Sequence, residues 1–567
     1  VARIRCDLLR GRSRKPVTLL INDGEREMSQ ELKDSYQSLR EDFEWSPPAE
    51  YNFAEDVIDF WARQDESRLA MKWIDDHDNR RDVTFSELSS RSKQVANALS
   101  KLGVKRRDVI ILVVGREVEW WEVLTGSIRM GAVCSPGTTQ LSPKDIAYRI
   151  QASKATCFIG DRENALKLNE VFDECPTLKA KLVIGDPLPG WNYYEDVISS
   201  ASKDFKKIGT KYEEEALCYF TSGTTGYPKM TIHNHGYGYA HQITGKYWLD
   251  LSPGDLHWNI SDTGWAKAAY SSYFGPWNQG ATLFVHHSPV FDPVKTLDLL
   301  ASNPVTTMCG APTIYRMLVL QDLSHYKFST LRHCVGAGEP LNPEVIETWK
   351  KATGITIRDG YGQTETVLVC GNYPNLPAKF GSMGKPAPGI EMGIIDSEGN
   401  LLGFDQEGDI AIKIKPDRAP GLFVDYRGDP ERYKSCFVGD WYITGDRGKV
   451  DDDGYFWFVS RADDVILSAG YRIGPFEVES ALIEHESVAE SAVVASPDGT
   501  RGAVVKAFIV LAPGFEGSDE LVKTLQEHVK STTAPYKYPR KVEFVDSLPK
   551  TVSGKIRRIE LREREES

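Results

Sequence analysis

The sequence lacks the features that mark several common classes of protein. No apolar run approaches the roughly 18 residues of a membrane helix, and the densest one, Val109 to Val114, has the length of a strand. The net charge of −13 provides no basic excess, which argues against non-specific binding of nucleic acid. The nine cysteines include no C-x-x-C pair, so a reducing compartment fits best. No cysteine or carboxylate cluster accompanies His233 and His235, which we interpret as loop residues rather than metal ligands.

The length of 567 residues predicts two or more domains. Residues up to about 45 form an N-terminal extension, and its first fifteen residues are basic. This stretch is either the remnant of a transit peptide, which is typically rich in arginine, or a solvated arm. We predict a cytoplasmic location, with the mitochondrial matrix as the alternative.

A regular alternation of helix and strand patterns begins at Phe85. Leu88, Val95 and Leu99 lie on one helical face, Val109 to Val114 is typical of a buried strand, and a helix then precedes a strand at Gly131 to Cys134. This alternation predicts an α/β fold with mainly parallel sheets and flanking helices. The tail predicts a small α+β domain with helices at 475–486 and 519–531 and strands at 489–495, 503–511 and 541–545.

The most informative stretch spans Thr221 to Lys229 and follows an apolar strand pattern, Ala216 to Phe220. It combines hydroxyl residues, two glycines, a proline and a lysine. Glycines let backbone N–H groups approach a ligand closely, and hydroxyls with a lysine add donors and positive charge, which suits polyphosphate. The stretch is not a Walker A loop, because Pro228 occupies the position of the second glycine. An ordinary polar loop is the alternative.

Five more motifs follow in order, at residues 336–340, 359–366, 439–446, 461–464 and 549–555. The set of six resembles the acyl-adenylate-forming enzymes, which include acyl-CoA synthetases, luciferases and peptide-synthetase adenylation domains. The resemblance covers roughly residues 85 to 555. Segments 260–265, 470–475 and 534–541 make the chain most similar to the medium-chain acyl-CoA synthetases.

The resemblance implies an ATP site. Thr364 would offer a hydroxyl to the α-phosphate, and Glu365 would offer a carboxylate to Mg²⁺, which binds through one or two carboxylates plus phosphate oxygens. Asp446 and Arg461 would reach the ribose, and Arg472 would meet a phosphate. The remaining nucleotide contacts implied are Thr221, Ser222, Gly223, Thr224, Thr225, Gly226, Lys229, Gly338, Glu339, Pro340, Asp359, Gly360, Tyr361, Gly362 and Gln363.

The same resemblance implies an acyl pocket formed by Trp265, Lys267, Cys309, Gly310 and Gly362. Residues 263–275 contain no carboxylate, whereas amino-acid-activating relatives use an aspartate there to pair with the substrate ammonium group. Lys267 either extends its head to polar groups while its stem narrows the pocket, or points outward. Lys267 and Cys309 favour a short or branched acid.

Further residues are implied for the CoA half of the reaction, namely Gln140, Ala469, Gly470, Tyr471, Arg501, Lys530 and Tyr538. Asp463 would be the hinge between a large domain, residues 1–462, and a small domain, residues 463–567. Lys555 would enter the site during adenylation and align the carboxylate with the α-phosphorus. After adenylation the small domain would rotate, withdraw Lys555 and bring the CoA contacts to the adenylate.

The sequence therefore predicts an acid–thiol ligase that uses ATP, Mg²⁺ and CoA to convert a short, medium-chain or branched carboxylic acid to acyl-CoA through acyl-AMP. Alternatives are an aryl-CoA ligase of the benzoate type and an adenylating enzyme directed to a carrier protein or an amine. A luciferase-like oxygenase and a non-catalytic nucleotide-binding protein are further alternatives. A homodimer is one of the oligomeric states left open.

Overall fold

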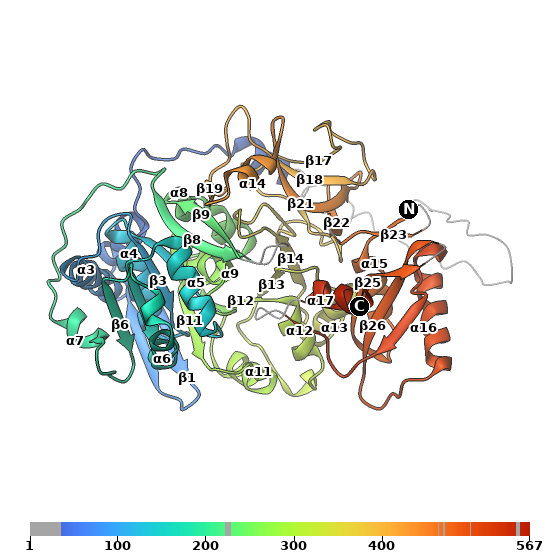
Figure 1. Ribbon diagram of the computed structural model, residues 1–567, viewed down its shortest axis with the longest axis horizontal. Coiled ribbons are helices and arrows are strands. Elements are labelled where there is room, and N and C mark those ends of the chain that lie inside the picture. The colour runs from blue at the N-terminus through green and yellow to red at the C-terminus, as the bar shows by residue number, and fades with distance from the viewer. Residues whose placement is uncertain are drawn as a thin grey trace.

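A computed structural model describes residues 36–221, 228–462, 464–468, 471–498, 501–550 and 556–566, apart from the side chains of Arg472 and Glu566. Figure 1 shows a large N-terminal domain and a smaller C-terminal domain, coloured red, beside it. The large domain contains two sheets that are mainly parallel and a third that is antiparallel. The predicted α/β class with a small α+β domain is confirmed.

The first sheet has eight strands. In spatial order they are β19 (Asp425–Arg427), β9 (Lys229–Asn234), β8 (Glu215–Thr221), β4 (Val133–Pro136), β3 (Val109–Val113), β5 (Cys157–Asp161), β6 (Ala180–Ile184) and β7 (Asn192–Tyr193). The strands from β8 to β7 are mutually parallel, whereas β9 pairs antiparallel with both β8 and β19. Loops after the parallel strands therefore emerge at one edge.

Helices cover both faces of this sheet, as the apolar run in β3 predicts. All five residues of β3 are buried. Ile110 and Leu112 belong to the core that includes α3 (Phe85–Lys101) and α4 (Val118–Arg129). The alternate residues, such as Ile111, pack with α5 (Pro143–Ser153) and α6 (Arg162–Glu170). A strand that is buried on both faces does not need to alternate apolar and polar residues, so it can be a continuous apolar run.

The second sheet has nine strands and carries most of the later motifs. In spatial order they are β16 (Lys385–Pro386), β15 (Cys370–Gly371), β14 (Ile357–Tyr361), β13 (His333–Ala337), β12 (Thr307–Gly310), β10 (Leu256–Ile260), β11 (Thr282–His287), β1 (Leu69–Asp75) and β2 (Arg80–Thr84). Strands β1 and β10 to β14 are parallel. The motifs at 338–340 and 362–365 directly follow β13 and β14, so the parallel order places them at the same edge.

The large domain contains further α-helices and π-helices. They are the π-helix η1 (Ala54–Ile58), α2 (Asp59–Gln64), α7 (Tyr194–Ser199), α8 (Gly236–Ala240), the π-helix η3 (Thr244–Trp248), α9 (Ala266–Ala269), the π-helix η4 (Tyr270–Phe274), α10 (Gly275–Asn278), α11 (Pro293–Ser302), α12 (Pro312–Val319), α13 (Pro343–Thr353) and α14 (Pro430–Ser435). Helices α11, α12 and α13 bury their apolar side chains in one core against the second sheet.

The third sheet was not predicted from the sequence. It comprises β17 (Met392–Ile395), β18 (Gly408–Lys413), β21 (Trp441–Val450), β20 (Phe437–Val438) and β22 (Phe456–Arg461), all antiparallel. A hairpin turn at Asp451 to Gly454 joins β21 to β22. Pairing of these two strands sets Asp446 opposite Arg461.

The C-terminal domain contains the helices and strands expected, with small shifts at their ends. Its elements are β23 (Ile466–Ser468), β24 (Tyr471–Ile473), α15 (Pro475–Ile483), β25 (Val488–Asp498), β26 (Gly502–Leu511), α16 (Asp519–Thr532), β27 (Lys541–Phe544) and α17 (Arg558–Glu566). The sequence analysis missed the hairpin β23–β24 and the terminal helix α17.

One strand boundary was wrong. The segment predicted as a strand from Gly131 to Cys134 begins at Val133 instead. Gly131 has a positive φ of 66° and its N–H donates to the Ile128 carbonyl, so it belongs to the turn that ends α4.

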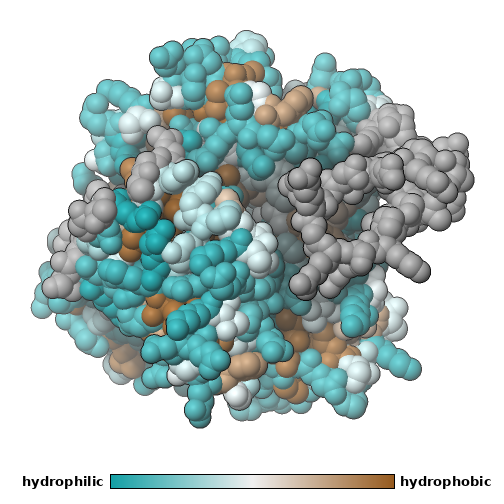
Figure 2. All heavy atoms as spheres, turned by 90° about the vertical axis from the view of Figure 1, so that its right-hand side faces the viewer, coloured by the Kyte–Doolittle hydropathy of each residue, from teal (hydrophilic) through white to brown (hydrophobic). Residues whose placement is uncertain are grey.

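The described end of the N-terminal extension packs against the large domain. Residues 36–42 are helical, and the Tyr36 hydroxyl donates to the Pro386 carbonyl at 2.7 Å. The Trp45 indole donates to the Gly389 carbonyl at 2.8 Å. Figure 2 shows a mainly hydrophilic surface on the side of the C-terminal domain. Every helix in the described ranges is too short or too polar to cross a membrane.

Candidate active site

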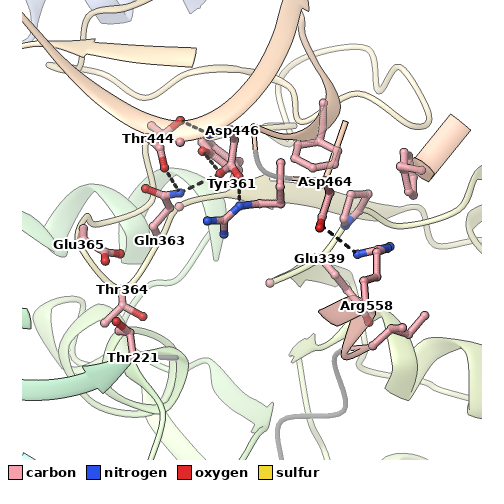
Figure 3. A pocket seen from close by; sticks show the side chains of 18 of the residues that line it. Thr221, Glu339, Tyr361, Gln363, Thr364, Glu365, Thr444, Asp446, Asp464 and Arg558 are labelled. Carbon is pink, nitrogen blue, oxygen red and sulfur yellow. Dashed lines mark hydrogen bonds and ion pairs between the residues drawn. The ribbon is translucent and has the colours of Figure 1, made fainter. Parts of the chain in front are cut away.

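A cavity of about 830 Å³ lies between the two domains. Its large-domain lining comes from the ends of β8, β13 and β14 and from β21. Its C-terminal lining comes from α15, β25 and α17. In Figure 3, Thr221, Thr364 and Glu365 lie at one end of this cavity, and Glu339, Asp464 and Arg558 at the other. The fold thus gathers residues of all six sequence motifs around one space.

Asp446 is the centre of a hydrogen-bonded network in the cavity wall (Figure 3). Its Oδ2 accepts from the Tyr361 hydroxyl at 2.6 Å and from Gln363 Nε2 at 2.8 Å. Its Oδ1 lies 3.1 Å from Arg461 Nε. Burial, followed by the negative charge of Asp446, raises the pKa of Tyr361 well above its usual range, so this hydroxyl remains a donor.

The network fixes Asp446 and Arg461, which the sequence analysis assigned to the ribose, together with Tyr361 and Gln363. Gln363 also donates to the Thr444 carbonyl at 2.8 Å and accepts from the Tyr442 hydroxyl at 3.2 Å. With Asp446 only 4% exposed, its carboxylate has little freedom to reorient. A preorganised carboxylate of this kind suits recognition of two vicinal hydroxyls.

Glu365 is held by a residue that the sequence analysis did not identify. The Tyr426 hydroxyl donates to Glu365 Oε1 at 2.6 Å, and the Glu365 carbonyl accepts from Phe423 N at 2.8 Å. Tyr426 belongs to β19, whose antiparallel pairing with β9 sets it opposite Thr231. No local motif marks Tyr426, because its position depends on pairing between strands that are far apart in sequence.

Lys229 lies beside this pair, with its Nζ 5.0 Å from the centroid of the Tyr426 ring. Burial, and then the like charge of Arg432, lower the pKa of Lys229. Arg432 also lines the cavity and was missed by the sequence analysis. Two cations on the side of Thr221 and Pro228 favour binding of an anion there.

A single carboxylate is available for Mg²⁺ at this end of the cavity. Hydrogen bonding of Tyr426 to Oε1 leaves Oε2 of Glu365 for a cation. Groups of three or more metal-binding side chains are absent from the described ranges. One carboxylate still fits Mg²⁺, which commonly takes its other ligands from phosphate oxygens and water.

The Tyr426→Phe variant tests this arrangement. Losing a hydrogen bond to a charged carboxylate costs about 1.5–3 kcal/mol, so we expect kcat for pyrophosphate release to fall roughly 10- to 100-fold. The apparent affinity for Mg²⁺ should fall in parallel. Tyr326→Phe is a matched control, since the Tyr326 ring stacks on Phe328 with centroids 6.1 Å apart and does not line the cavity. Unchanged magnesium dependence in Tyr426→Phe would show that Tyr426 does not orient Glu365.

The loop at Gly338–Pro340 is also tied down by side chains. Glu339 Oε1 accepts from the Thr313 hydroxyl at 2.8 Å and from Arg316 at 2.9 Å. Gly338 has a φ of 112°, which a residue with a side chain rarely adopts. Arg316 was missed because it lies on α12, outside every motif.

Asp359 is buried under the same loops. Its carboxyl group accepts from the N–H groups of Gly360 at 2.9 Å and Leu341 at 3.4 Å. Burial nevertheless raises the pKa of Asp359 to about 8. The cavity wall therefore contains a carboxyl group that is largely protonated at neutral pH.

This shift predicts a pH dependence of stability. The native pKa of Asp359 lies above the ordinary value of about 4, so the folded state holds the proton more tightly than the unfolded state. The free energy of unfolding should therefore fall as pH rises from about 4 towards about 8. Asp359→Asn cannot titrate, and its melting temperature should fall less than that of the parent between about pH 5 and about pH 8.5. If the melting temperatures of the two proteins changed equally with pH, Asp359 would not have a raised pKa in the folded state.

Of the two orientations considered for Lys267, the structure has the inward one. Lys267 Nζ donates to the Ala337 carbonyl at 2.9 Å, so its head reaches the end of β13. Cys309 and Gly310 are buried on β12, and Trp265 precedes α9. Among the predicted acyl-pocket residues, Gly362 lines the cavity, whereas Trp265, Lys267, Cys309 and Gly310 are not part of its lining.

The described CoA candidates lie outside the cavity lining. Gln140 is exposed after β4.

On the small domain, Tyr471 stacks on Tyr536 with ring centroids 4.4 Å apart. Lys530 Nζ lies 4.3 Å from the centroid of the Tyr538 ring, whose hydroxyl accepts from Arg540 at 2.7 Å. Arg501 is exposed at the start of β26. Lys530, Tyr538 and Arg540 thus form a cationic cluster around one aromatic ring.

Several predicted residues lie outside the described part of the chain. They are Ser222, Gly223, Thr224, Thr225, Gly226, Asp463, Ala469, Gly470 and Lys555, together with the side chain of Arg472. The residues that flank two of these segments line the cavity. Thr221 and Pro228 line the cavity, and so do Lys550 and Ile556.

Comparison with known proteins agrees with this geometry. The family model described as AMP-binding enzyme matches residues 58–421, and the AMP-binding enzyme C-terminal domain model matches residues 477–555. The mitochondrial acyl-coenzyme A synthetase ACSM3 of Homo sapiens is 51% identical over 541 residues, covering 94% of this chain and 92% of that protein. The mitochondrial acyl-coenzyme A synthetase ACSM4 of Mus musculus is 49% identical over 528 residues, or 91% of each chain.

Solved structures show the same fold. The anthranilate CoA ligase AuaEII in complex with anthranoyl-AMP has a TM-score of 0.84 at 30% identity, covering 92% of this chain and 98% of that one. The acyl-CoA synthetase of Brucella canis has a TM-score of 0.73 at 34% identity, covering 94% and 98%. Fold and site together define an adenylate-forming enzyme of the AMP-binding class. Within that class, the chain belongs to the family of acyl-coenzyme A synthetases.

Proposed function

We propose that this protein converts a carboxylic acid, ATP and CoA to acyl-CoA, AMP and pyrophosphate in two half-reactions at the interdomain cavity. The observation that carries the proposal is the joint placement of Asp446, Tyr361, Gln363 and Glu365 around one cavity. A nucleotide bound to this network would present its phosphates towards Lys229 and Glu365.

In the first half-reaction, a carboxylate oxygen of the acid attacks the α-phosphorus. A bond forms between this carboxylate oxygen and the α-phosphorus. The bond from the α-phosphorus to the oxygen that bridges the α- and β-phosphates breaks, and pyrophosphate leaves. Lys229 and Arg432 would balance charge on the departing group, and the Thr364 hydroxyl would donate to the α-phosphate. Glu365, oriented by Tyr426, would hold Mg²⁺, whose positive charge stabilises phosphate oxygens. Lys555 would align the two reacting groups, since Lys550 and Ile556 both line the cavity.

In the second half-reaction, the CoA sulfur attacks the acyl carbon and a C–S bond forms. The bond from the acyl carbon to the phosphate oxygen breaks, AMP leaves, and the thiol proton passes to water. We propose that the small domain rotates about Asp463 to bring Tyr471, and the segment that contains Ala469 and Gly470, to the adenylate. Arg501, Lys530 and Tyr538 would then contact the CoA nucleotide, and Gln140 would lie near its pantetheine arm. Their positions outside the adenylation cavity support this assignment, with Gln140 and Arg501 exposed and Lys530 and Tyr538 half-buried.

The Asp463→Pro variant tests the hinge. Proline fixes φ near −65° and removes the backbone N–H, so we expect acyl transfer to CoA from supplied acyl-AMP to slow roughly 10-fold or more. Acyl-AMP formation should change much less. Asp463→Ala, which keeps backbone freedom, serves as the control and should retain both steps. An unaltered second half-reaction in Asp463→Pro would remove Asp463 from the hinge.

A short or branched acid is the substrate class that we favour. Lys267 donates to the Ala337 carbonyl at 2.9 Å, and Cys309 is buried on β12, the strand that pairs with β13. An aromatic acid is the second candidate, because the structures of an anthranilate CoA ligase and of a benzoate CoA ligase from Burkholderia xenovorans resemble this chain, the latter with a TM-score of 0.80 at 28% identity. The names of the relatives say mitochondrial, which supports a mitochondrial location in place of the cytoplasm that we predicted first.

Formation of AMP across a panel of acids tests the function and the pocket together. The panel runs from acetate through branched five-carbon acids to octanoate and benzoate. We expect AMP formation to require CoA and to peak at a short or branched acid. A peak at benzoate would support the aromatic alternative. Pyrophosphate release without turnover on CoA would mean that the acyl group goes to another acceptor.

A further inference from the structure

The terminal helix α17 is attached to the small domain at both of its ends. Leu561 is fully buried in a cluster with Val494, Phe508 and Leu548. Near the end of the helix, Glu565 accepts from the Ser496 hydroxyl and from Lys506 Nζ, each at 2.6 Å. The matching family model ends at residue 555, before this helix begins.

Arg558, in the first turn of α17, forms a two-pronged ion pair with Glu479 of α15. Its NH2 lies 2.7 Å from Oε2, and its Nε lies 3.1 Å from Oε1. Glu479 is 5% exposed and also accepts from Val493 N at 2.8 Å. Burial opposes the charge on Arg558, yet Glu479 raises the pKa of Arg558 above its ordinary value. Bidentate pairs of this kind fix orientation as well as distance.

Arg562, one turn later, ties the helix to the residue that follows the predicted hinge. Its NH1 donates to Asp464 Oδ1 at 2.7 Å, and Arg558 NH1 lies 3.8 Å from Asp464 Oδ2. Asp464 N in turn donates to the carbonyl of Arg461, the partner of Asp446. A continuous series of contacts therefore connects α17 with the ribose side of the cavity. Figure 3 shows Asp464 and Arg558 together at this end of it.

The chain just before α17 is also pinned at the cavity. Lys550 and Ile556 form an antiparallel bridge, and Arg557 N donates to the Pro549 carbonyl at 2.8 Å. Lys550 Nζ pairs with Glu490 at 2.7 Å. The residues of this region that line the cavity are Lys550, Ile556, Arg557, Arg558, Ile559 and Arg562. Both ends of the interval from 551 to 555 are therefore held at the cavity by described contacts.

We propose that Arg558 and Arg562 are positioning residues for adenylate formation. By fixing α17 to Glu479 and Asp464, they set where Lys555, three residues before Arg558, meets the nucleotide. The proposal rests on the role of Lys555 in the proposed function. Neither arginine needs to touch the substrate, because each acts by fixing the position of α17 and therefore of the chain that precedes it.

The two half-reactions separate this role from a general contribution to stability. Pyrophosphate release requires Lys555, whereas acyl transfer from supplied acyl-AMP requires an intact small domain but not this lysine. In Arg562→Ala we expect kcat for pyrophosphate release to fall roughly 10-fold or more, because even a small displacement of Lys555 would misalign it with the reacting groups. KM for ATP and the rate of acyl transfer should each stay within about twofold.

Conservative and control variants sharpen the test. Arg562→Lys keeps a cation opposite Asp464 and should recover part of the lost kcat. Arg558→Lys removes the bidentate geometry but keeps the charge, and should show the same selective loss as Arg562→Ala. Arg564→Ala, an exposed arginine of the same helix outside the cavity lining, should behave as the parent does.

Two results would overturn the proposal. Equal loss of both half-reactions in Arg562→Ala, with a lowered melting temperature, would assign the arginine to stability alone. Full adenylation activity in both Arg562→Ala and Arg558→Lys would show that the ion pairs do not matter for positioning. Lys555→Ala is measured in parallel. If that variant retains adenylation, the proposed role of Lys555 fails first, and the two failures are thereby distinguished.

Discussion

The Lys555→Ala variant should lose formation of acyl-AMP almost completely and keep the transfer of a supplied acyl-AMP to CoA. Removing one preorganised charge from a developing transition state costs roughly 10²- to 10³-fold in kcat. Lys555 would bridge the acid and the α-phosphate, so its loss also removes alignment of the two reactants. The CoA thiol attacks only after this lysine has withdrawn, so acyl transfer should change less than about twofold.

Acid-dependent exchange of pyrophosphate into ATP measures the first half-reaction, and acyl-CoA formed from synthetic acyl-AMP measures the second. Lys523→Ala is the control, since Lys523 is an exposed lysine on α16. Loss of both half-reactions to the same extent would contradict the two-conformation mechanism, because a single arrangement of the domains would then serve both steps.

The Asp446→Ala variant should have the largest effect on nucleotide binding. It deletes the acceptor of Tyr361 and Gln363 and the partner of Arg461 at once. Leaving buried donors without an acceptor costs about 1–3 kcal/mol for each group. We expect kcat/KM for ATP to fall at least roughly 100-fold, with most of the change in KM.

Asp451→Ala is the matched control for this variant. Asp451 is a carboxylate in the same β21–β22 hairpin that pairs with Lys379 at 2.7 Å but does not line the cavity. Its replacement should lower the melting temperature and leave KM for ATP near the parent value. A normal KM for ATP in Asp446→Ala, measured by equilibrium binding as well as kinetics, would exclude Asp446 from the nucleotide site.

Local patterns predicted much of the fold. The apolar run at β3, the helical face of α3 and the tail from α15 to β27 were all apparent because each depends on residues close together in sequence. The antiparallel third sheet was missed because its central pairing, between β18 and β21, joins segments that are far apart in sequence. The terminal helix α17 was missed because its only fully buried apolar residue is Leu561, which gives almost no periodic signal.

The candidate site divides in the same way. Motif residues such as Asp446, Tyr361 and Glu365 could be proposed because each stands in a distinctive local sequence. The residues that support these motif residues could not be predicted from the sequence. Tyr426 reaches Glu365 only through the pairing of β19 with β9, and Arg316 reaches Glu339 only because α12 packs beside β13. Residues that orient a site through tertiary contacts carry no signature in a single sequence.

One single-turnover experiment tests the central claim most directly. The protein is mixed with labelled ATP and its preferred acid, and CoA is added only after the first phase is complete. The account predicts about one pyrophosphate released per active site before CoA is added, with AMP retained as bound acyl-AMP. Addition of CoA should then release AMP and acyl-CoA in equal amounts. Release of AMP with pyrophosphate before CoA is present, or formation of ADP, would contradict a stored adenylate and the domain movement that consumes it.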